Sequence, residues 1–210
     1  MGNGGPPACE DIARRLATLT ASAVADATGG QGVVGAGLIR FSGSGTVAGR
    51  AVTADCAEGS LMAVFPALDR AQPGDVLCMT APGPTAYLGD LLASDIANRG
   101  LVAVVVDGLI RDKDTIAGLP VSVFARGVTP VARRGRDRGR SMTPVHIGGV
   151  PVHPGDWIVA DGDGVLVIPP REVQAVLQKA EDNAHTEARI MARIKEGATV
   201  LDAVTQETGQ

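Results

Sequence analysis

Aromatic side chains are scarce in this 210-residue chain, which has one Trp, one Tyr and three Phe. A hydrophobic core must therefore be filled mainly by Val, Ala, Leu and Ile, for which the 45% hydrophobic content is ample. The formal net charge of −4 gives no general attraction to nucleic acid or to an anionic membrane. No apolar run reaches membrane-spanning length and no signal peptide is recognisable, so we expect a soluble, cytoplasmic protein with no nucleic-acid or membrane partner.

Cysteine and histidine are equally sparse, and neither occurs in a metal-ligand pattern. The cysteines are odd in number and scattered, which is typical of reduced thiols: Cys9, Cys56 and Cys78. The three histidines are far apart in sequence, and no Gly-x-Ser-x-Gly motif is present. Zinc-dependent hydrolysis and serine nucleophile chemistry are therefore disfavoured.

Glycine and proline are abundant, with 28 and 13 residues, and predict many turns in a β-rich α/β fold of one domain over residues 1–210. We expect a flexible leader at 1–9 and a long amphipathic helix at 171–196, of a kind that often packs on a neighbouring subunit. The other expected helical elements are segments at 10–28, a helix at 60–68 and one helical turn at 115–118. The expected strands are two within 38–58 and one each at 76–80, 120–125, 158–160 and 165–168, with a strand or hairpin at 144–152. A Pro/Gly loop at 81–87 is expected to form one wall of a pocket.

Two other motifs are better explained as structure than as binding sites. Residues 30–35 formally match Gly-x-Gly-x-x-Gly, but a helical pattern precedes them where a dinucleotide fingerprint needs a strand. The basic run Arg133–Arg140 has no interleaved aromatic residue for stacking on bases. We expect a solvated loop or a subunit contact there, and a smaller alternative is that one arginine reaches the second carboxylate of a diacid substrate.

Residues 89–114, GDLLASDIANRGLVAVVVDGLIRDKD, combine a short helix, a buried strand and an Arg-Asp pair. Apolar residues recur at helical spacing over 90–99, and a glycine follows where helices commonly end. The uninterrupted, mostly β-branched run at 101–106 predicts a strand covered on both faces. Asp107-Gly108 is then expected to turn the chain, with Arg111-Asp112 just beyond the strand.

The residue types in this stretch suit the binding of an anion and a metal. A helix N-terminus offers unpaired backbone N–H groups, so the amides of Leu91 and Leu92 can hold a carboxylate, and Arg111 can hold the same anion or stabilise an enolate oxygen. Asp90 and Asp112 are hard oxygen ligands of the kind that Mg²⁺ or Mn²⁺ accepts. These residues predict a site for a small α-keto acid chelated to a divalent metal.

Spacing alone leaves a structural alternative open. Single Asp and Arg residues on loops are common, so Asp107-Gly108 could be only a turn and Arg111-Asp112 only a solvated ion pair.

The stretch GDLLASDIANRGLVAVVVDGLIRD resembles the core signature of the RraA-like family, whose enzyme branch is the class II 4-hydroxy-4-methyl-2-oxoglutarate / 4-carboxy-4-hydroxy-2-oxoadipate aldolases. The similarity continues through residues 120–127 and 154–165 and, more weakly, 20–27, so it covers most of the chain. The non-enzymatic RNase E regulators of this family lack the metal-binding Asp after the Arg. Asp112 is present here, which favours the enzyme branch.

This resemblance implies an α/β fold of the RraA-like β/β/α swivelling-domain type, an αββα sandwich with a long C-terminal helix. It implies a homotrimer or homohexamer whose active site lies between neighbouring subunits. The implied activity is that of a lyase, which cleaves a 4-hydroxy-2-oxo diacid to pyruvate and a second keto acid through a metal-stabilised pyruvate enolate. The same site should decarboxylate oxaloacetate, because that reaction also leaves a pyruvate enolate.

The family's site residues carry over to matching positions of this chain. Asp112 would be the direct ligand of Mg²⁺ or Mn²⁺, Asp90 would hold a metal-bound water, and Arg111 would stabilise the enolate. Gly89 and the amides of Leu91 and Leu92 would bind the substrate carboxylate.

The family also takes a glutamate near its C-terminus from the adjoining subunit. Glu187 is our candidate, and Glu181 and Glu196 are alternatives.

Lysine is too rare to favour the other route to aldol cleavage, a Schiff base. Lys113 lies between Asp112 and Asp114, where carboxylates favour the charged amine, and the remaining two lysines belong to the polar C-terminal helix. Two further hypotheses stay open besides the metal-dependent aldolase. One is an RraA-type regulator that binds an RNA-processing enzyme, and the other is a family member recruited to another enolate or hydrolytic step.

Overall fold

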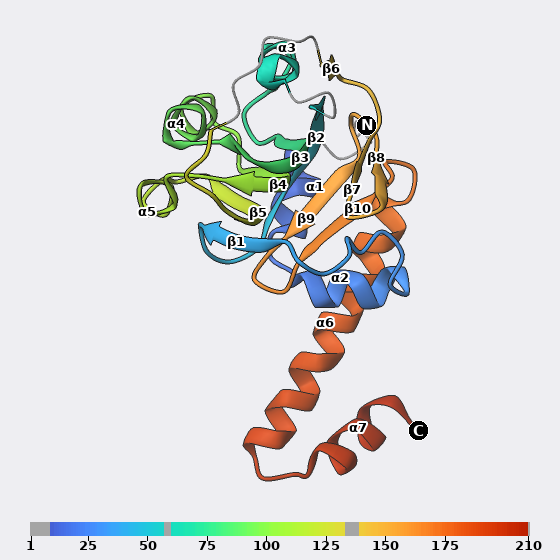
Figure 1. The fold of residues 1–210 in the computed structure, drawn as a ribbon. Helices are drawn as coiled ribbons and strands as arrows, with labels where there is room; N and C mark the ends of the chain where they lie inside the picture. The colour runs from blue at the N-terminus through green and yellow to red at the C-terminus, as the bar shows by residue number, and fades with distance from the viewer. Residues whose placement is uncertain (1–8, 57–59, 133–138, 210) are drawn as a thin grey trace.

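The computed structural model describes residues 9–56, 60–132 and 139–209 (Figure 1). The flexible leader was expected to extend through residue 9, but Cys9 begins the first helix. Residues 1–8 lie outside the described part of the chain. No helix in the described part is long and apolar enough to cross a bilayer.

The helices follow the expected pattern except at the C-terminus. They are α1 (Cys9–Leu16), α2 (Ala21–Thr28), the 3₁₀ turn η1 (Leu61–Ala63), α3 (Val64–Leu68), α4 (Asp90–Asn98), α5 (Lys113–Ile116), α6 (Val173–Lys195) and α7 (Val200–Thr208). Ser60 caps η1, since its hydroxyl accepts a hydrogen bond from the amide of Met62 at 3.0 Å. Gly100 follows α4 with φ +79°, the left-handed conformation that glycine adopts most easily after a helix.

The strands form one curled sheet and a separate hairpin. They are β1 (Ile39–Ser42), β2 (Val47–Asp55), β3 (Val76–Leu88), β4 (Ala103–Ile110), β5 (Ser122–Val128), β6 (Arg140–Ser141), β7 (Val145–Ile147), β8 (Val150–Val152), β9 (Trp157–Ala160) and β10 (Val165–Ile168). The sheet order within the described residues is β1-β5-β4-β3-β2-β9-β10, with β6 on β2, and β7 pairs with β8. Strands β2 to β5 run parallel, whereas β1, β6, β9 and β10 pair antiparallel to their neighbours.

Strand β2 joins the two halves of this sheet. Its residues 47–50 pair with β9 and its residues 51–55 pair with β3, so the sheet bends along this one strand. Gly49 stands at the bend, where a Cβ atom would lie 2.1 Å from the carbonyl oxygen of Gly74. Only glycine allows that approach of the two backbones.

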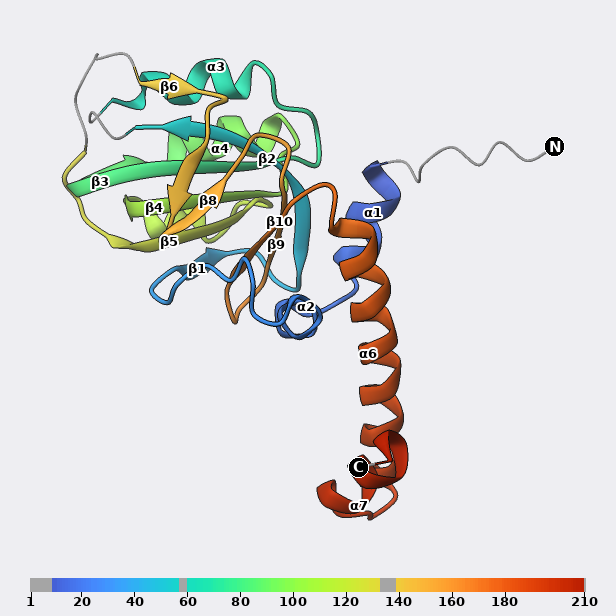
Figure 2. The ribbon, with the colours of Figure 1, turned by 90° about the vertical axis from the view of Figure 1, so that its right-hand side faces the viewer.

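Successive side chains along each strand point to opposite faces of the sheet, and the buried apolar side chains form three clusters. In β4, Val104 and Val106 face α3, α4 and α5, whereas Ala103 and Val105 face the layer formed by β7–β10. The other face of β9 and β10, with Val159 and its neighbours, packs under α1, α2 and α6. Figures 1 and 2 show the resulting order of helices, sheet, sheet and helices, so the expected αββα sandwich is confirmed.

Two expectations near the centre of the chain are wrong. Asp107-Gly108 is not a turn, because β4 continues through it to Ile110 with a break in register. Gly108 lets β3 approach, since a Cβ atom there would lie 1.9 Å from the carbonyl oxygen of Ala81. Residues 81–87 are likewise an irregular continuation of β3 and not a separate loop.

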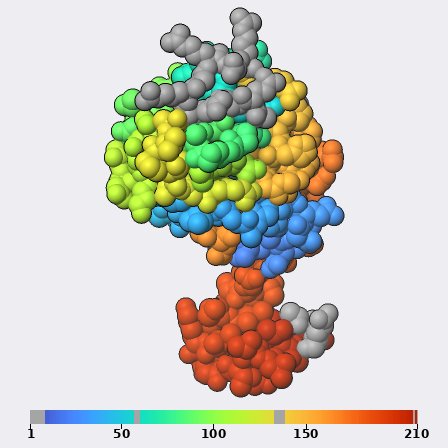
Figure 3. Space-filling model, viewed as in Figure 1, coloured from blue at the N-terminus to red at the C-terminus, as the bar shows by residue number. Residues whose placement is uncertain are grey.

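The C-terminal helices form an arm that leaves the body of the domain (Figures 2 and 3). The first half of the apolar stripe on α6 is buried against the domain, but Met191 in the second half is 52% exposed. Helix α7, which was not expected from the sequence, folds back onto α6 and buries Ala203 completely. Thr199 caps α7 by accepting a hydrogen bond from the amide of Asp202 at 3.2 Å.

One glutamate ties α7 to α6. Arg189 and Arg193 donate hydrogen bonds to Glu207 at 2.7 and 2.6 Å, and these bonds lower the pKa of Glu207 from its ordinary value. A lowered pKa in the folded state means that the stabilisation is present above the ordinary glutamate pKa and is lost as the pH falls through the lowered one.

Glu207→Gln should therefore release α7 at neutral pH. We expect the amides of residues 200–208 to exchange hydrogen faster than in the wild type, whereas β4 stays equally protected. In the wild type, α7 should lose this protection progressively as the pH falls from the ordinary glutamate pKa of about 4.3 through the lowered pKa of Glu207. Glu196→Gln, an exposed neighbour, is the control, and equal protection of α7 in both variants would contradict the role of Glu207.

Candidate active site

Chain topology brings the predicted site residues together. Strands β3 and β4 are parallel neighbours, with Leu88 opposite Ile110, so the segments that leave them start at the same edge of the sheet. Only Gly89 separates β3 from α4, and Arg111-Asp112 is the whole connection from β4 to α5. The amide of Arg111 donates to the carbonyl oxygen of Leu88 at 2.9 Å, which holds the two exits side by side.

The backbone at Asp112 directs its carboxylate toward α4. Asp112 has φ +56° and ψ +37°, a left-handed conformation that is uncommon for residues other than glycine but tolerated by Asp and Asn. Its Oδ2 lies 3.3 Å from the amide nitrogen of Asp90, at the first turn of α4, and 3.2 Å from Nε of Arg111. Strained backbone of this kind often accompanies functional sites.

Gly89 makes this close arrangement sterically feasible. A Cβ atom at position 89 would lie 2.8 Å from Oδ2 of Asp112 and 2.9 Å from Nε of Arg111. The φ of Gly89 is −130°, so its backbone is open to any residue, and the lack of a side chain is what matters. A position expected to bind substrate therefore has a packing role in the structure.

The amides at the start of α4 are only partly available to a ligand. The amide of Leu91 donates to Oδ1 of Asp90 at 2.8 Å, so a substrate carboxylate would have to displace Asp90 from it. The amide of Leu92 lies in the same first turn, where a helix supplies no acceptor of its own. Leu92 is thus the more accessible of the two predicted donors.

A small cavity of about 180 Å³ opens at this helix terminus. Asp90 and Arg111 line it, together with the expected wall from the end of β3 at Ala86 and Tyr87. None of the described residues accepts a hydrogen bond from the terminal guanidinium nitrogens of Arg111, so these donors are open to an anion. Leu61 and Ala132 also line the cavity, and no pattern in the sequence singled them out.

The carboxylates fit an open metal site and not a closed one. Within the described residues, no group of three or more His, Cys, Asp or Glu side chains is placed to hold a metal. The carboxylate of Asp112 nevertheless lies at the backbone amide of Asp90, in the first turn of α4, and Mg²⁺ commonly binds one or two carboxylates and keeps several waters. A Mg²⁺ or Mn²⁺ ion held partly by water and substrate is compatible with this donor set.

None of the three candidate glutamates joins the site within one chain. Glu187 is exposed on α6, and Figures 1 and 2 show α6 running away from α4 and α5. Glu181 accepts hydrogen bonds from Arg15 at 2.8 and 2.6 Å, and this pairing lowers its pKa. Glu196 is exposed just after the end of α6. A role for Glu187 would need a second copy of the chain and stays a prediction.

The basic run ends at Arg140 in β6, and its residues Arg133–Arg138 lie outside the described part of the chain. Arg140 donates to Oδ2 of Asp55 at 2.7 and 3.2 Å. The other oxygen of Asp55 accepts a hydrogen bond from Thr80 at 2.9 Å. Arg140 is therefore bound within its own chain.

The family that the sequence matches agrees with this curled αββα sheet and with the Arg-Asp pair beside the start of α4. The chain belongs to the RraA-like family, described as Aldolase/RraA, which matches residues 20–167.

Individual relatives point to both branches of the family. A Halalkalibacterium halodurans protein provisionally named 4-hydroxy-4-methyl-2-oxoglutarate aldolase is 36% identical over 182 residues, covering 85% of this chain and 87% of its own. The crystal structure of RraAS2 from Streptomyces coelicolor, described as an unusual member of the RNase ES inhibitor RraA protein family, has a TM-score of 0.73 and 28% identity, and covers 85% of this chain and 94% of its own. An uncharacterised protein from Pseudomonas syringae pv. tomato has a TM-score of 0.82 at 24% identity over 95% of this chain and 99% of its own, which supports the fold alone.

Proposed function

We propose that this protein is a divalent-metal-dependent lyase that cleaves a 4-hydroxy-2-oxo diacid to pyruvate and a second keto acid, and that also decarboxylates oxaloacetate. The observation that carries the proposal is the position of Asp112. Its left-handed backbone holds a carboxylate at the N-terminus of α4, beside the guanidinium of Arg111 and the backbone amide of Asp90. The aldolase name of the Halalkalibacterium halodurans relative supports the same reaction class.

The residues of this chain would position and polarise the keto acid. The amide of Leu92 and the terminal nitrogens of Arg111 would bind the carboxylate and the 2-oxo oxygen. Cleavage breaks the bond between C3 and C4, and its electron pair becomes the enolate of pyruvate. Arg111 then faces the oxygen on which negative charge develops, where a preorganised donor has its largest effect.

Two protons must move in this reaction. The C4 hydroxyl gives up a proton as C4 becomes a carbonyl, and C3 of the enolate gains one to form pyruvate. Asp90 lines the cavity and is placed to accept a hydrogen bond or a proton there. In a homotrimer or homohexamer, Glu187 of a second copy would be the alternative acceptor.

Asp112, with Asp90 nearby, would hold the metal. When bound, Mg²⁺ or Mn²⁺ would supply a Lewis acid that favours the enolate form of pyruvate.

A second candidate function is an RraA-type regulator that binds an RNA-processing enzyme. The structural similarity to RraAS2 favours it. The carboxylate of Asp112 beside Arg111 at the start of α4 has no evident use in such a regulator, so the lyase is the better-supported proposal.

A coupled assay for pyruvate tests the proposal directly. We expect the purified protein to release pyruvate from oxaloacetate and from 4-hydroxy-4-methyl-2-oxoglutarate with added Mg²⁺ or Mn²⁺, and to lose this activity with a chelator. Release that does not exceed the rate of the metal ion alone would exclude the lyase. A panel of 4-hydroxy-2-oxo acids would then identify the preferred diacid.

Gly89→Ala should impair the site without unfolding the domain. The new methyl group would press on Oδ2 of Asp112 and Nε of Arg111, so both groups must shift. We expect kcat to fall by about tenfold or more, because small misplacements of positioning groups are costly. Gly118→Ala is the matched control, since the nearest atom to a Cβ there is 3.6 Å away. A Gly89→Ala enzyme as active as Gly118→Ala would contradict this packing role.

A further inference from the structure

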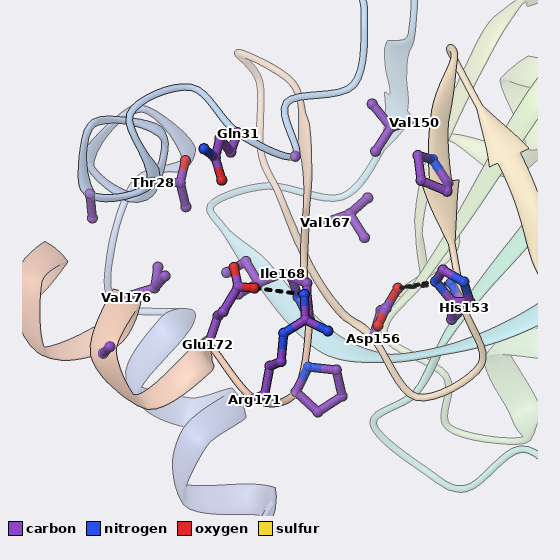
Figure 4. Close-up of a pocket in the computed structure, with 16 residues that line it drawn as sticks. Thr28, Gln31, Val150, His153, Asp156, Val167, Ile168, Arg171, Glu172 and Val176 are labelled. Atoms are coloured by element: carbon purple, nitrogen blue, oxygen red, sulfur yellow. Dashed lines mark hydrogen bonds and ion pairs between the residues drawn. The ribbon is translucent and has the colours of Figure 1, made fainter.

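A second and larger cavity, of about 860 Å³, lies between α2, the β8–β9 connection and the start of α6 (Figure 4). It shares no lining residue with the cavity at α4. Its volume is within the range of pockets that hold small organic molecules. Val150, Val167, Ile168 and Val176 give it an apolar wall, to which β8, β10 and α6 contribute.

One buried charge faces this apolar wall. Asp156 lines the cavity, yet its side chain is only 8% exposed. Its Oδ2 accepts a hydrogen bond from the backbone amide of His153 at 2.8 Å and lies 3.4 Å from Nδ1 of the same residue. No other described side chain donates to the carboxylate of Asp156, and its Oδ1 has no hydrogen-bond partner among the described residues. A carboxylate removed from water in this way favours a donor or a cation.

The remaining charges around the cavity largely cancel. Arg171 and Glu172 form an ion pair at 3.0 Å on the rim, and Figure 4 shows the two side chains directed at each other. Arg171 is therefore already paired with an anion of its own chain. The buried carboxylate of Asp156 is the charge that a ligand would meet against the apolar wall.

We propose that this cavity binds a small organic amine, whose ammonium group pairs with Asp156 and whose apolar body packs against Val167, Ile168 and Val176. The charge of Asp156 excludes an anion of the same shape from that position. Binding at this cavity does not depend on the proposed lyase activity, because the two cavities have separate walls.

Three fluorinated probes of nearly the same shape test the charge preference. Dissociation constants of 4-fluorobenzylamine, 4-fluorobenzyl alcohol and 4-fluorobenzoate are measured by ¹⁹F NMR on the full chain. We expect the amine to bind about tenfold more tightly than the alcohol, since hydrogen bonds to charged groups are the stronger ones. The benzoate should bind weakest. Benzoate binding equal to or tighter than amine binding, or no amine binding at millimolar concentration, would overturn the proposal.

Variants locate the binding to this cavity. Asp156→Asn keeps an oxygen for the amide of His153 but removes the charge, so amine affinity should fall to that of the alcohol. Ala175→Phe places a ring in the cavity from an exposed position of α6 and should abolish amine binding. Gln174→Phe adds the same ring at an exposed neighbour that does not line the cavity and should leave binding unchanged.

The phenylalanine pair decides the result if Asp156→Asn fails to fold. Equal amine binding by Ala175→Phe and Gln174→Phe would place the amine elsewhere and refute the assignment. Self-association of the wild-type chain is followed by light scattering in the same samples. Amine binding that disappears as the chain associates would show that a second copy covers the cavity, and this result would also refute the assignment.

Discussion

Asp112→Asn is expected to reduce pyruvate release to the rate that the metal ion gives without protein. Asn tolerates the left-handed backbone of position 112, and its side-chain oxygen can still accept a hydrogen bond from the amide of Asp90. The substitution removes only the negative charge that a divalent ion needs. Because Asp112 is partly exposed and its only ion pair among the described residues is with Arg111, we expect the melting temperature to change little.

Metal affinity and activity should fall together in this variant. Titration of Mn²⁺ followed by electron paramagnetic resonance measures the affinity, and the coupled assay measures pyruvate release. Asp114→Asn, two residues further on and exposed in α5, removes an equal charge outside the site and serves as the control. Metal-dependent activity of Asp112→Asn equal to that of Asp114→Asn would end the case for a metal at this position.

Arg111→Ala is expected to lower kcat by about 10²-fold or more, the usual loss when a donor to a developing oxyanion is removed. The guanidinium nitrogens that line the cavity would no longer meet the enolate oxygen. KM should rise as well if Arg111 also binds the carboxylate of the substrate. The folded structure should persist, because Arg111 is half-buried and its side chain pairs only with Asp112 among the described residues.

Arg111→Lys separates charge from geometry. A lysine keeps the positive charge but lacks the planar fork that binds two oxygens at once, so we expect only partial recovery of kcat. Arg70→Ala, an exposed arginine next to α3, is the control for a general loss of positive charge. An Arg111→Ala enzyme with the kcat of Arg70→Ala would remove Arg111 from the mechanism.

The local elements of the fold were predictable because their signals are local. The helix of α4 follows from apolar spacing and a terminal glycine, and Ser60 caps its helix as its side-chain chemistry indicates. The hairpin around residues 148–149 and the long helix α6 were equally visible. Helix α7 was missed although Thr199 and Asp202 form a capping pair, because the helix is short and, of the side chains that the structure describes in it, only that of Ala203 is fully buried.

The errors fall where neighbouring strands override local preference. Asp-Gly at 107–108 is a common turn sequence, yet β4 continues there because β3 pairs with both residues, and β5 pairs with β4 before and after them. Asp107 then accepts a hydrogen bond from the amide of Gly148 at 2.8 Å, which anchors the β7–β8 hairpin. The turn propensity of a dipeptide is a local property, so it does not predict contacts with residues that are distant in the sequence.

The sequence by itself determined which residues compose the candidate site: Asp90, Arg111 and Asp112 have the chemistry for a keto acid and a metal, and they flank a recognisable helix and strand. Only the tertiary structure decided that they meet. Parallel pairing of β3 and β4 places their ends at one edge, the missing side chain of Gly89 leaves room, and a left-handed Asp112 turns its carboxylate to the helix. The cavity at Asp156 was invisible in the sequence for the same reason, since its walls come from segments that are distant in the chain and become neighbours only when the sheet curls.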